Sequence, residues 1–371
     1  MLALLLTLVL AACGDTTATT APAATTASTT TAAATTAAST TAAATTATAT
    51  TVASTTAAST TAAASTAAST TAPATTAAAT ATTAASSTTT ASGASSTTSY
   101  PVTVTDDAKR SVTLEKAPSR IISLAPSNTE LLYSLGLGES IVGVDTYSNY
   151  PPEAAKKEKI GDLKTNLEKV VSLNPDLVLA AGITAQQTIS DLQAKGVKVM
   201  VLNPSNLAGV VTDIKLLAKA TNTTAKGESV ASDFQKKLDD VAAKVKSAGS
   251  SPRVFYELDP TLFTIGPGSF IDDMIQKAGG QNIVTDGSNP YPQLNQETVI
   301  SKDPQVILVG DDSGGEDTPD KILARPGWSG ISAIKNKRVY AINADLVNRP
   351  GPRAADGVVE IAKALYPDLF K

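Results

Sequence analysis

The chain has 371 residues, a formal net charge of -4, one cysteine and no histidine. The missing histidine excludes a serine–histidine nucleophile, a histidine-ligated metal site and an axial histidine on haem, and the single cysteine excludes a CxxC redox pair and an internal disulfide. The negative net charge argues against a nucleic-acid partner, because phosphates favour a basic surface.

The first thirteen residues, MLALLLTLVLAAC, form a short apolar run that ends in the only cysteine. The run is too short to span a bilayer as a stable helix and is typical of an export signal. Residues 10–13, LAAC, resemble a bacterial lipobox, although no Lys or Arg precedes the run. We therefore expect residues 1–13 to be a lipoprotein signal and lipidated Cys13 to anchor the chain to the outer face of the cell membrane. The alternative is a buried N-terminal segment with an incidental cysteine.

Residues 14–99 are almost wholly threonine, alanine and serine. No window in this segment has enough large apolar side chains to offset the entropy of ordering the backbone, so we predict that it is disordered. A flexible coil of this length spans roughly 50 Å root-mean-square. The segment is therefore expected to be a tether between the membrane and a folded part.

The first half of the folded part alternates strands with helices, as in an α/β protein. Ser127 or Asn128, after Pro126, is expected to cap the first helix, and Asn166 a later one. The expected elements are the strand RIISLA (120–125), a helix in SNTELLYSLGLG (127–138) that Gly136 and Gly138 can end, the strand SIVGVD (140–145), a helix of one or two turns that follows Asn166 and stops before Pro175, the strand LVLAA (177–181), the helix TAQQTISDLQAKG (184–196) and the strand KVMVLN (198–203).

The second half repeats this order. NLEKVVSLNPDLVL (166–179) and NQETVISKDPQVIL (295–308) keep the Asn, Glu, Ser, Pro and apolar positions at one spacing. Each half is therefore predicted to be a Rossmann-like lobe with a mainly parallel sheet flanked by helices. The expected elements of this half are the strand RVFYEL (253–258), the helix SFIDDMIQKAGG (269–280), the strand QNIV (281–284), the helix NQETVISKD (295–303) and the strand PQVILVG (304–310).

A single long helix is predicted between the halves, over residues 223–249. Its apolar residues recur at spacings of three and four, which places them on one helix face. The helix would join an N-terminal lobe, residues 100–222, to a C-terminal lobe, residues 250–371. The alternative is an ordinary surface helix within one domain. The residues on the apolar face are Val230, Phe234, Leu238, Val241 and Val245.

Residues 101–371 resemble the helical-backbone solute-binding proteins of ABC importers. The similarity is carried by RIISLAPSNTELLYSLGLGESIVGV, YSNYPPEA, NLEKVVSLNPDLVLA and PYPQLNQETVISKDPQVILV, which follow an apparent lipoprotein signal and a polar tether. The resemblance implies a monomeric, non-enzymatic protein without a cofactor or resident metal. Such proteins capture cobalamin, a ferric siderophore or haem and deliver it to the membrane-spanning subunits of an importer, and this sequence is most similar to the cobalamin-binding branch.

The resemblance also assigns a docking role to one glutamate in each half. Glu168 and Glu297 match the residues that such proteins present to arginines of the importer. Each follows a capping asparagine, and a carboxylate in the first turn of a helix is stabilised by the helix dipole whatever else it does. Both interpretations of these carboxylates stay open at this point.

The ligand is expected between the lobes, against loops at the carboxyl ends of strands. These loops offer four aromatic side chains and three charged ones: Tyr147, Tyr150, Phe263, Tyr291, Asp345, Arg349 and Arg353. The resemblance implies that all of these except Tyr150 and Arg353 touch a corrinoid. Alternatively, each tyrosine packs a loop onto its own lobe, and the arginines bind carboxylates of a ferric siderophore.

Two further observations limit the likeness to cobalamin binders. Tryptophans that some of them carry near the first docking motif are replaced by GDLKT and AAGIT, and Trp328 is expected near the hinge with a structural role.

An enzyme is the main alternative class of function. A carboxylate hydrolase needs no histidine, but GxSxG, P-loop and GxGxxG signatures are absent, so an enzyme is not expected. A stalked surface sensor or adhesion protein remains an alternative.

Overall fold

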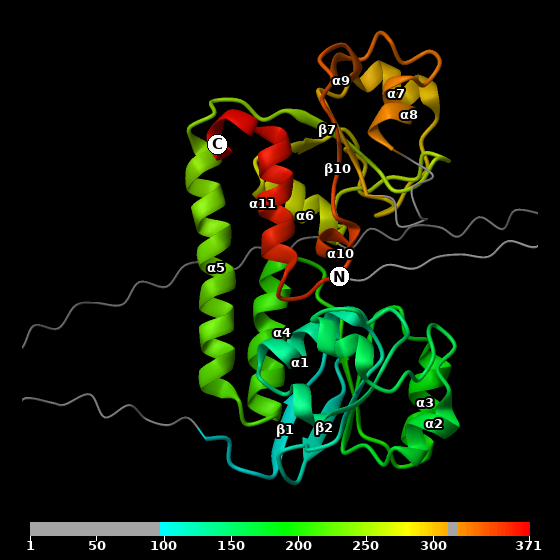
Figure 1. Cartoon of the computed structure of the whole chain (residues 1–371), viewed down its shortest axis with the longest axis vertical. Coiled ribbons are helices and arrows are strands. Elements are labelled where there is room, and N and C mark those ends of the chain that lie inside the picture. Colours follow the sequence, from blue (N-terminus) through cyan, green and yellow to red (C-terminus); the bar gives the residue numbers. More distant parts are fainter. Residues whose placement is uncertain (1–96, 311–317) are drawn as a thin grey trace, which may run out of the picture. The chain divides into compact units, whose positions relative to one another are not determined.

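The computed structural model describes residues 97–310 and 318–371, which belong to the unit Ser87–Lys371. The predicted signal, Cys13 and nearly all of the predicted tether lie outside the described residues. The described part contains two separate four-stranded parallel sheets, each with helices beside it, and a two-stranded antiparallel hairpin (Figure 1). The predicted α/β class with two parallel-sheet lobes is confirmed.

The first sheet has the strand order β4-β3-β5-β6. Its strands are short and almost fully buried, as expected of a parallel sheet covered on both faces. They are β3 (Ile121–Ser123), β4 (Ile141–Val144), β5 (Leu177–Ala181) and β6 (Val199–Leu202). The accompanying helices are α1 (Pro126–Ser134), α2 (Leu167–Ser172), α3 (Gln186–Ala194) and α4 (Leu207–Ala220), with two 3-10 helices at Gly138–Ser140 and Pro152–Lys156.

The second sheet has the order β8-β7-β9-β10. Counted within each half, both sheets have the order second, first, third, fourth, so the repeated sequence folds into a repeated topology. The strands are β7 (Arg253–Glu257), β8 (Gln281–Asn282), β9 (Val306–Val309) and β10 (Val339–Ala341). The helices are α6 (Phe270–Lys277), α7 (Gln296–Lys302), α8 (Pro319–Leu323), α9 (Ser332–Lys335), α10 (Ala344–Val347) and α11 (Ala354–Leu365), with a 3-10 helix at Pro367–Phe370.

The long helix is α5 (Thr224–Lys246), slightly shorter than the predicted residues 223–249. It packs on α4 beside the first sheet and on α6 and α11 beside the second. The alternative of a surface helix within one domain is therefore wrong. Of the predicted apolar face, the three central residues are buried and the two outer ones are half-buried. The buried ones are Phe234, Leu238 and Val241.

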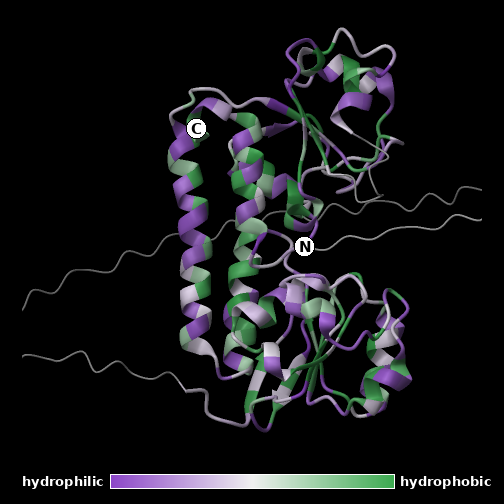
Figure 2. Cartoon of the chain, viewed as in Figure 1, coloured by the Kyte–Doolittle hydropathy of each residue, from purple (hydrophilic) through white to green (hydrophobic). Residues whose placement is uncertain are grey.

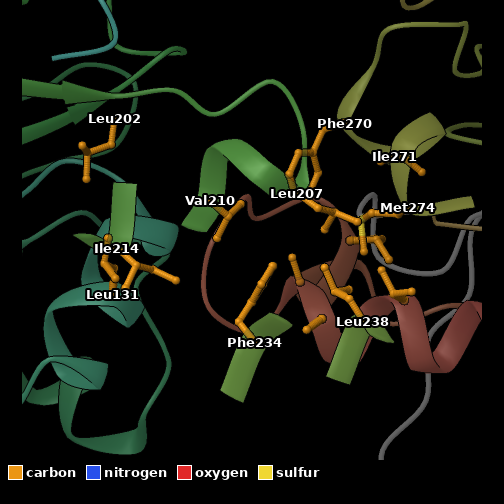
Figure 3. Close-up of a cluster of buried hydrophobic side chains, with 14 of the residues drawn as sticks. Leu131, Leu202, Leu207, Val210, Ile214, Phe234, Leu238, Phe270, Ile271 and Met274 are labelled. Atoms are coloured by element: carbon orange, nitrogen blue, oxygen red, sulfur yellow. The ribbon is translucent and has the colours of Figure 1, made fainter. Parts of the chain in front are cut away.

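One hydrophobic core runs through both lobes. It contains residues of the two sheets together with α1, α4, α5, α6 and α11, and Figure 3 shows side chains of α4, α5 and α6 meeting within it. Each sheet has a smaller core on the face that does not contact the shared core. That of the first sheet lies beneath α2 and α3, and that of the second lies beneath α7, α8 and α9. Figure 2 shows hydrophobic residues along α11, whereas α5 is largely hydrophilic in this view. Because interiors are close-packed, the shared core opposes large hinge motion between the lobes.

An antiparallel hairpin of β1 (Val102–Thr105) and β2 (Ser111–Leu114) precedes the first sheet and was not predicted. Its alternate side chains are buried in the shared core. Asp106 closes the turn by accepting hydrogen bonds from Arg110, and it also accepts one from the Val201 backbone N–H at 3.0 Å. These hydrogen bonds attach the hairpin to β6, the edge strand of the first sheet.

Three local predictions were wrong. Helix α1 begins at Pro126, so Ser127 and Asn128 lie inside it and do not cap it. Asp345 was expected in a loop, yet it lies in the short helix α10. Trp328 is fully buried and packs on Phe255, which confirms its structural role. Its predicted position near the hinge was wrong, because it lies in the core beneath α7 to α9.

Within residues 97–310 and 318–371, no helix combines the length and hydropathy needed to cross a membrane.

Candidate functional site

A cavity of about 400 Å³ lies between the lobes at the carboxyl ends of the strands, where the ligand was expected. In the first lobe it is lined by the connections after β3, β5 and β6, and in the second by those after β7, β8 and β10. Of the seven predicted ligand-contact residues, Tyr291 and Arg349 line this cavity. Tyr147 lines a smaller adjoining hollow of about 40 Å³, together with Leu163 and Ile183.

The four predicted aromatic residues are unusually exposed. Their exposed fractions are 63% for Tyr147, 46% for Tyr150, 40% for Phe263 and 48% for Tyr291. Rings that only packed loops onto their own lobes would be covered, so these fractions favour a contact surface over the packing alternative. Tyr150 is the exception in part, because one ring face carries the Arg353 guanidinium at 4.0 Å from the ring centroid.

Two aliphatic side chains extend this surface in the first lobe. Leu163 is 68% and Ile183 is 69% exposed. They lie in the segments GDLKT and AAGIT, where the sequence lacks tryptophan. Sequence reasoning noted that absence without assigning these two residues to the site, although a large apolar residue in each otherwise polar or small-residue loop was a usable signal.

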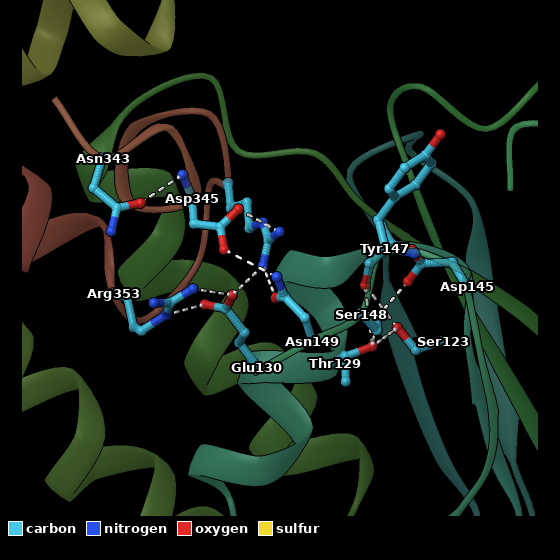
Figure 4. Close-up of polar contacts among 12 residues, drawn as sticks. Ser123, Thr129, Glu130, Asp145, Tyr147, Ser148, Asn149, Asn343, Asp345 and Arg353 are labelled. Carbon is cyan, nitrogen blue, oxygen red and sulfur yellow. Dashed lines mark hydrogen bonds and ion pairs between the residues drawn. The ribbon is translucent and has the colours of Figure 1, made fainter. Parts of the chain in front are cut away.

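Buried hydrogen bonds hold the Tyr147 loop (Figure 4). The Tyr147 backbone N–H donates to Asp145 Oδ1 at 2.8 Å, and the Ser148 hydroxyl donates to the other oxygen of Asp145. Ser148 also shares a 2.7 Å hydrogen bond with Thr129, which donates to Ser123 at 2.8 Å. Burial raises the pKa of Asp145 above its ordinary value, an effect opposed by these hydrogen bonds.

An ion cluster joins the two lobes at the cleft; it consists of Glu130, Asn149, Asp345, Arg349 and Arg353. Figure 4 labels its members Glu130, Asn149, Asp345 and Arg353. Glu130 of α1 accepts two hydrogen bonds from Arg353, at 2.8 and 2.6 Å, and one from Arg349 at 3.1 Å. Arg349 also donates to Asn149 at 2.7 Å and forms an ion pair with Asp345. Asn149 donates to Asp345 at 3.2 Å.

The cluster engages both arginines inside the protein. Their side chains are 12% and 18% exposed, and that of Glu130 is 2% exposed. The hydrogen bond to Glu130 raises the pKa of Arg353, and the fixed charges of two carboxylates balance those of two guanidiniums. Sequence reasoning found the arginines and Asp345 but missed Glu130 and Asn149. In the sequence of α1, Glu130 follows the polar residues Asn128 and Thr129, so no local pattern marked it as buried.

The loop that carries the arginines approaches the first lobe closely. A Cβ atom at Gly351 would lie 3.3 Å from the backbone oxygen of Ser127, which is tighter than most real contacts. Elsewhere, the Leu207 backbone N–H at the start of α4 donates to Asp273 of α6 at 2.8 Å. The lobes therefore touch through backbone as well as through charged side chains.

Glu168 and Glu297 lie in the first turns of α2 and α7 and are exposed. The Asn166 side chain caps α2, accepting from Lys169 N at 3.0 Å, and Asn295 caps α7 in the same way at 2.8 Å. Both helices cover the sheet faces turned away from α5. Among the described residues, neither carboxylate has an ion-pair partner.

No group of three or more possible metal ligands occurs in residues 97–310 and 318–371.

Comparison with known proteins agrees with this geometry. The model of the periplasmic binding protein family matches residues 121–346. The chain is 36% identical over 280 residues to an uncharacterized ABC transporter substrate-binding lipoprotein, YvrC of Bacillus subtilis, covering 73% of this chain and 88% of that protein.

Two solved structures are similar. The periplasmic vitamin B12 binding protein BtuF of Vibrio cholerae has a TM-score of 0.59 and 32% identity, over 67% of this chain and 97% of that one. The periplasmic heme-binding protein RhuT from Roseiflexus sp. RS-1 has a TM-score of 0.61 and 28% identity, over 68% and 99%. The chain therefore belongs to the periplasmic binding protein family and is a non-enzymatic, solute-binding component of the ABC importer class.

Proposed function

We propose that this protein is a membrane-anchored receptor that binds a corrinoid, such as cobalamin, between its lobes and delivers it to an ABC importer. The vitamin B12 binding protein of Vibrio cholerae supports the ligand class, as do cobalamin-binding relatives such as that of Halobacterium salinarum, 30% identical over 280 residues, 72% of this chain and 74% of that protein. The lipoprotein relative supports anchoring through Cys13.

The observation that carries the proposal is the set of exposed apolar side chains on both sides of the cleft. Ile183 and Tyr291 line the cavity from the first and second lobes, and Tyr147 and Leu163 line the adjoining hollow. Phe263 is an exposed side chain of the second lobe. The Phe263 and Tyr291 loops are joined, since Phe263 bridges Gln293. A corrinoid exceeds a cavity of about 400 Å³, so it would fill this space and rest on the surrounding side chains.

The amide-rimmed edge of a corrinoid also suits the ion cluster. Asp345 accepts hydrogen bonds and Arg349 donates them, so this pair can bind the amide N–H and C=O groups respectively. Asp345 has a 37% exposed side chain, which leaves part of its carboxylate accessible. Arg349 lines the cavity even though its partners are protein groups.

The second candidate ligand is haem or another ferric chelate. Heme-binding RhuT is one of the similar structures. Exposed phenol groups such as that of Tyr147 can ligate ferric iron in a chain without histidine. Against this alternative, the arginines that would bind carboxylates of the chelate are already paired with Glu130 and Asp345.

Titration of the purified chain decides between the candidates. Cyanocobalamin, cobinamide, haemin and a panel of ferric siderophores are each added while intrinsic fluorescence or heat is measured. The proposal expects saturable binding of a corrinoid with a sub-micromolar Kd. Tight binding of haemin or a siderophore, with no corrinoid binding, would refute it.

Delivery is proposed to use Glu168 and Glu297. Two exposed carboxylates, one on each lobe, can meet arginines of the importer only when their spacing fits, so they orient the encounter. We further propose that the protein acts as a monomer on the extracytoplasmic side of the membrane. Residues 14–99 would serve as the tether in this arrangement.

A further inference from the structure

We infer that Glu130 determines which charge class of chelate the cleft accepts, because it neutralises the two arginines beside the cavity. The inference rests on the proposed function and narrows it: neutral, amide-rimmed chelates are accepted and anionic chelates are disfavoured. Glu130 acts here as a positioning and specificity residue, since it holds the arginines from the opposite lobe.

The charges of the cluster balance without a ligand. Glu130 and Asp345 supply two negative charges, and Arg349 and Arg353 supply two positive ones. Glu130 is 3% exposed as a whole residue, so both of its oxygens depend on the arginines for hydrogen bonds. Two other charged groups lie at the neighbouring Tyr147 loop. The Arg349 charge acts on Asp145, and Lys159 donates hydrogen bonds to backbone oxygens of this loop.

An anionic chelate would be penalised in two ways. If its carboxylate took Arg349 from Glu130, a buried carboxylate would lose one of its hydrogen bonds and keep only those from Arg353, which is unfavourable. If Arg349 kept its present partners, the chelate would bring a third negative charge to a site whose positive charges are already balanced. A neutral chelate meets neither obstacle, because amide groups can share the outer edge of Asp345 and Arg349.

The variant Glu130→Gln tests this reasoning. Glutamine keeps the shape and one hydrogen-bond acceptor but removes one negative charge, which leaves the cluster with a net positive charge. The measured quantity is the ratio of haemin affinity to cyanocobalamin affinity. We expect this ratio to rise about tenfold or more in Glu130→Gln at low salt and the gain to shrink as salt is added, because it comes from charge.

A second variant keeps the test valid if Glu130→Gln does not fold. Asp345→Asn removes the same charge from the more exposed end of the cluster. Because Asp345 also contacts the corrinoid in the proposed function, the haemin affinity alone is compared for this variant, and it should rise by a smaller factor than the ratio rises in Glu130→Gln. Asp106→Asn is the matched control, since Asp106 is also buried and paired with an arginine but lies in the β1–β2 hairpin. Its affinity ratio should equal that of the wild type.

The outcomes separate the inference from the proposed function. Failure of the wild type to bind any corrinoid refutes the proposed function, whereas the haemin affinities of wild type and variants still test the inference. The inference is overturned if the ratio is unchanged in folded Glu130→Gln and the haemin affinity is unchanged in folded Asp345→Asn. It is also overturned if the change does not depend on salt concentration, or if neither variant binds haemin.

Discussion

The buried carboxyl group of Asp213 should make the protein less stable as the pH rises. Asp213 lies on α4, is 3% exposed, and no described N–H or O–H group donates a hydrogen bond to its oxygens. Burial, with the neighbouring Asp107 carboxylate as a second cause, raises its pKa from 3.8 to about 8. The group therefore carries a proton in the folded protein at neutral pH.

The sign of the effect follows from proton binding. The folded state holds this proton more tightly than the unfolded state, so its contribution to stability is full below about pH 3.8 and is lost as the pH rises through about 8. At about 1.36 kcal/mol per pH unit, the loss between pH 4 and pH 7 is of the order of 4 kcal/mol.

Asp213→Asn should remove this dependence, because an amide resembles the protonated carboxyl and does not titrate. At pH 8 the variant is expected to melt roughly 5–10 °C above the wild type, and at pH 4 the two should melt together. Thermal or urea unfolding from pH 4 to 8 measures the difference. Asp233→Asn, at an exposed position on α5, is the control and should follow the wild type. A difference between wild type and Asp213→Asn that does not vary with pH would refute the reasoning.

Three further predictions concern binding and transport. Glu168→Lys combined with Glu297→Lys should leave ligand affinity unchanged and abolish uptake, because the reversed charges repel the arginines of the importer; titration and cellular uptake measure the two effects. Phe263→Ala should weaken chelate binding roughly ten- to a hundredfold without lowering the melting temperature, since the 40% exposed ring is outside the buried core. Arg349→Ala should weaken binding and lower the free energy of unfolding by about 1–3 kcal/mol, because Glu130 loses one partner.

Each of these predictions has a clear contrary result. Normal uptake by the double reversal would remove the docking role, provided that Glu139→Lys with Asp233→Lys, an equal charge change away from α2 and α7, also transports normally. Wild-type affinity in Phe263→Ala would show that the second-lobe ring does not touch the ligand. Unchanged affinity in Arg349→Ala would remove that residue from the site.

Local sequence patterns predicted most of the fold because the strands and long helix have strong local signals. LVLAA is apolar throughout because β5 is buried on both faces, and Asn166 and Asn295 cap their helices with their own side chains. The hairpin β1–β2 was missed although its alternate residues are apolar. Its pattern covers only four residues in each strand, which is a weak signal on its own.

The candidate site was predicted less completely, for a physical reason. Exposed aromatic residues in loops can be noticed one at a time, and the four named from sequence are all exposed. The partners of an ion pair cannot be read locally when they are far apart: Glu130 lies 219 residues from Arg349 and 223 from Arg353. The arginines were therefore assigned to the ligand, and their carboxylate partner was found only in the folded chain.

The shared core and the Glu130 cluster affect how ligand-free and ligand-bound receptors compete for docking at the importer. Because these contacts are made between protein groups of the two lobes, they oppose a change in the separation of α2 and α7 when a ligand binds. In the proposed docking mode, an empty receptor thus presents nearly the same footprint as a loaded one. Ligand-free copies would then compete with ligand-bound copies for the docking site on the importer. A cell that makes more receptor than importer would slow its own uptake of the ligand when the ligand is scarce.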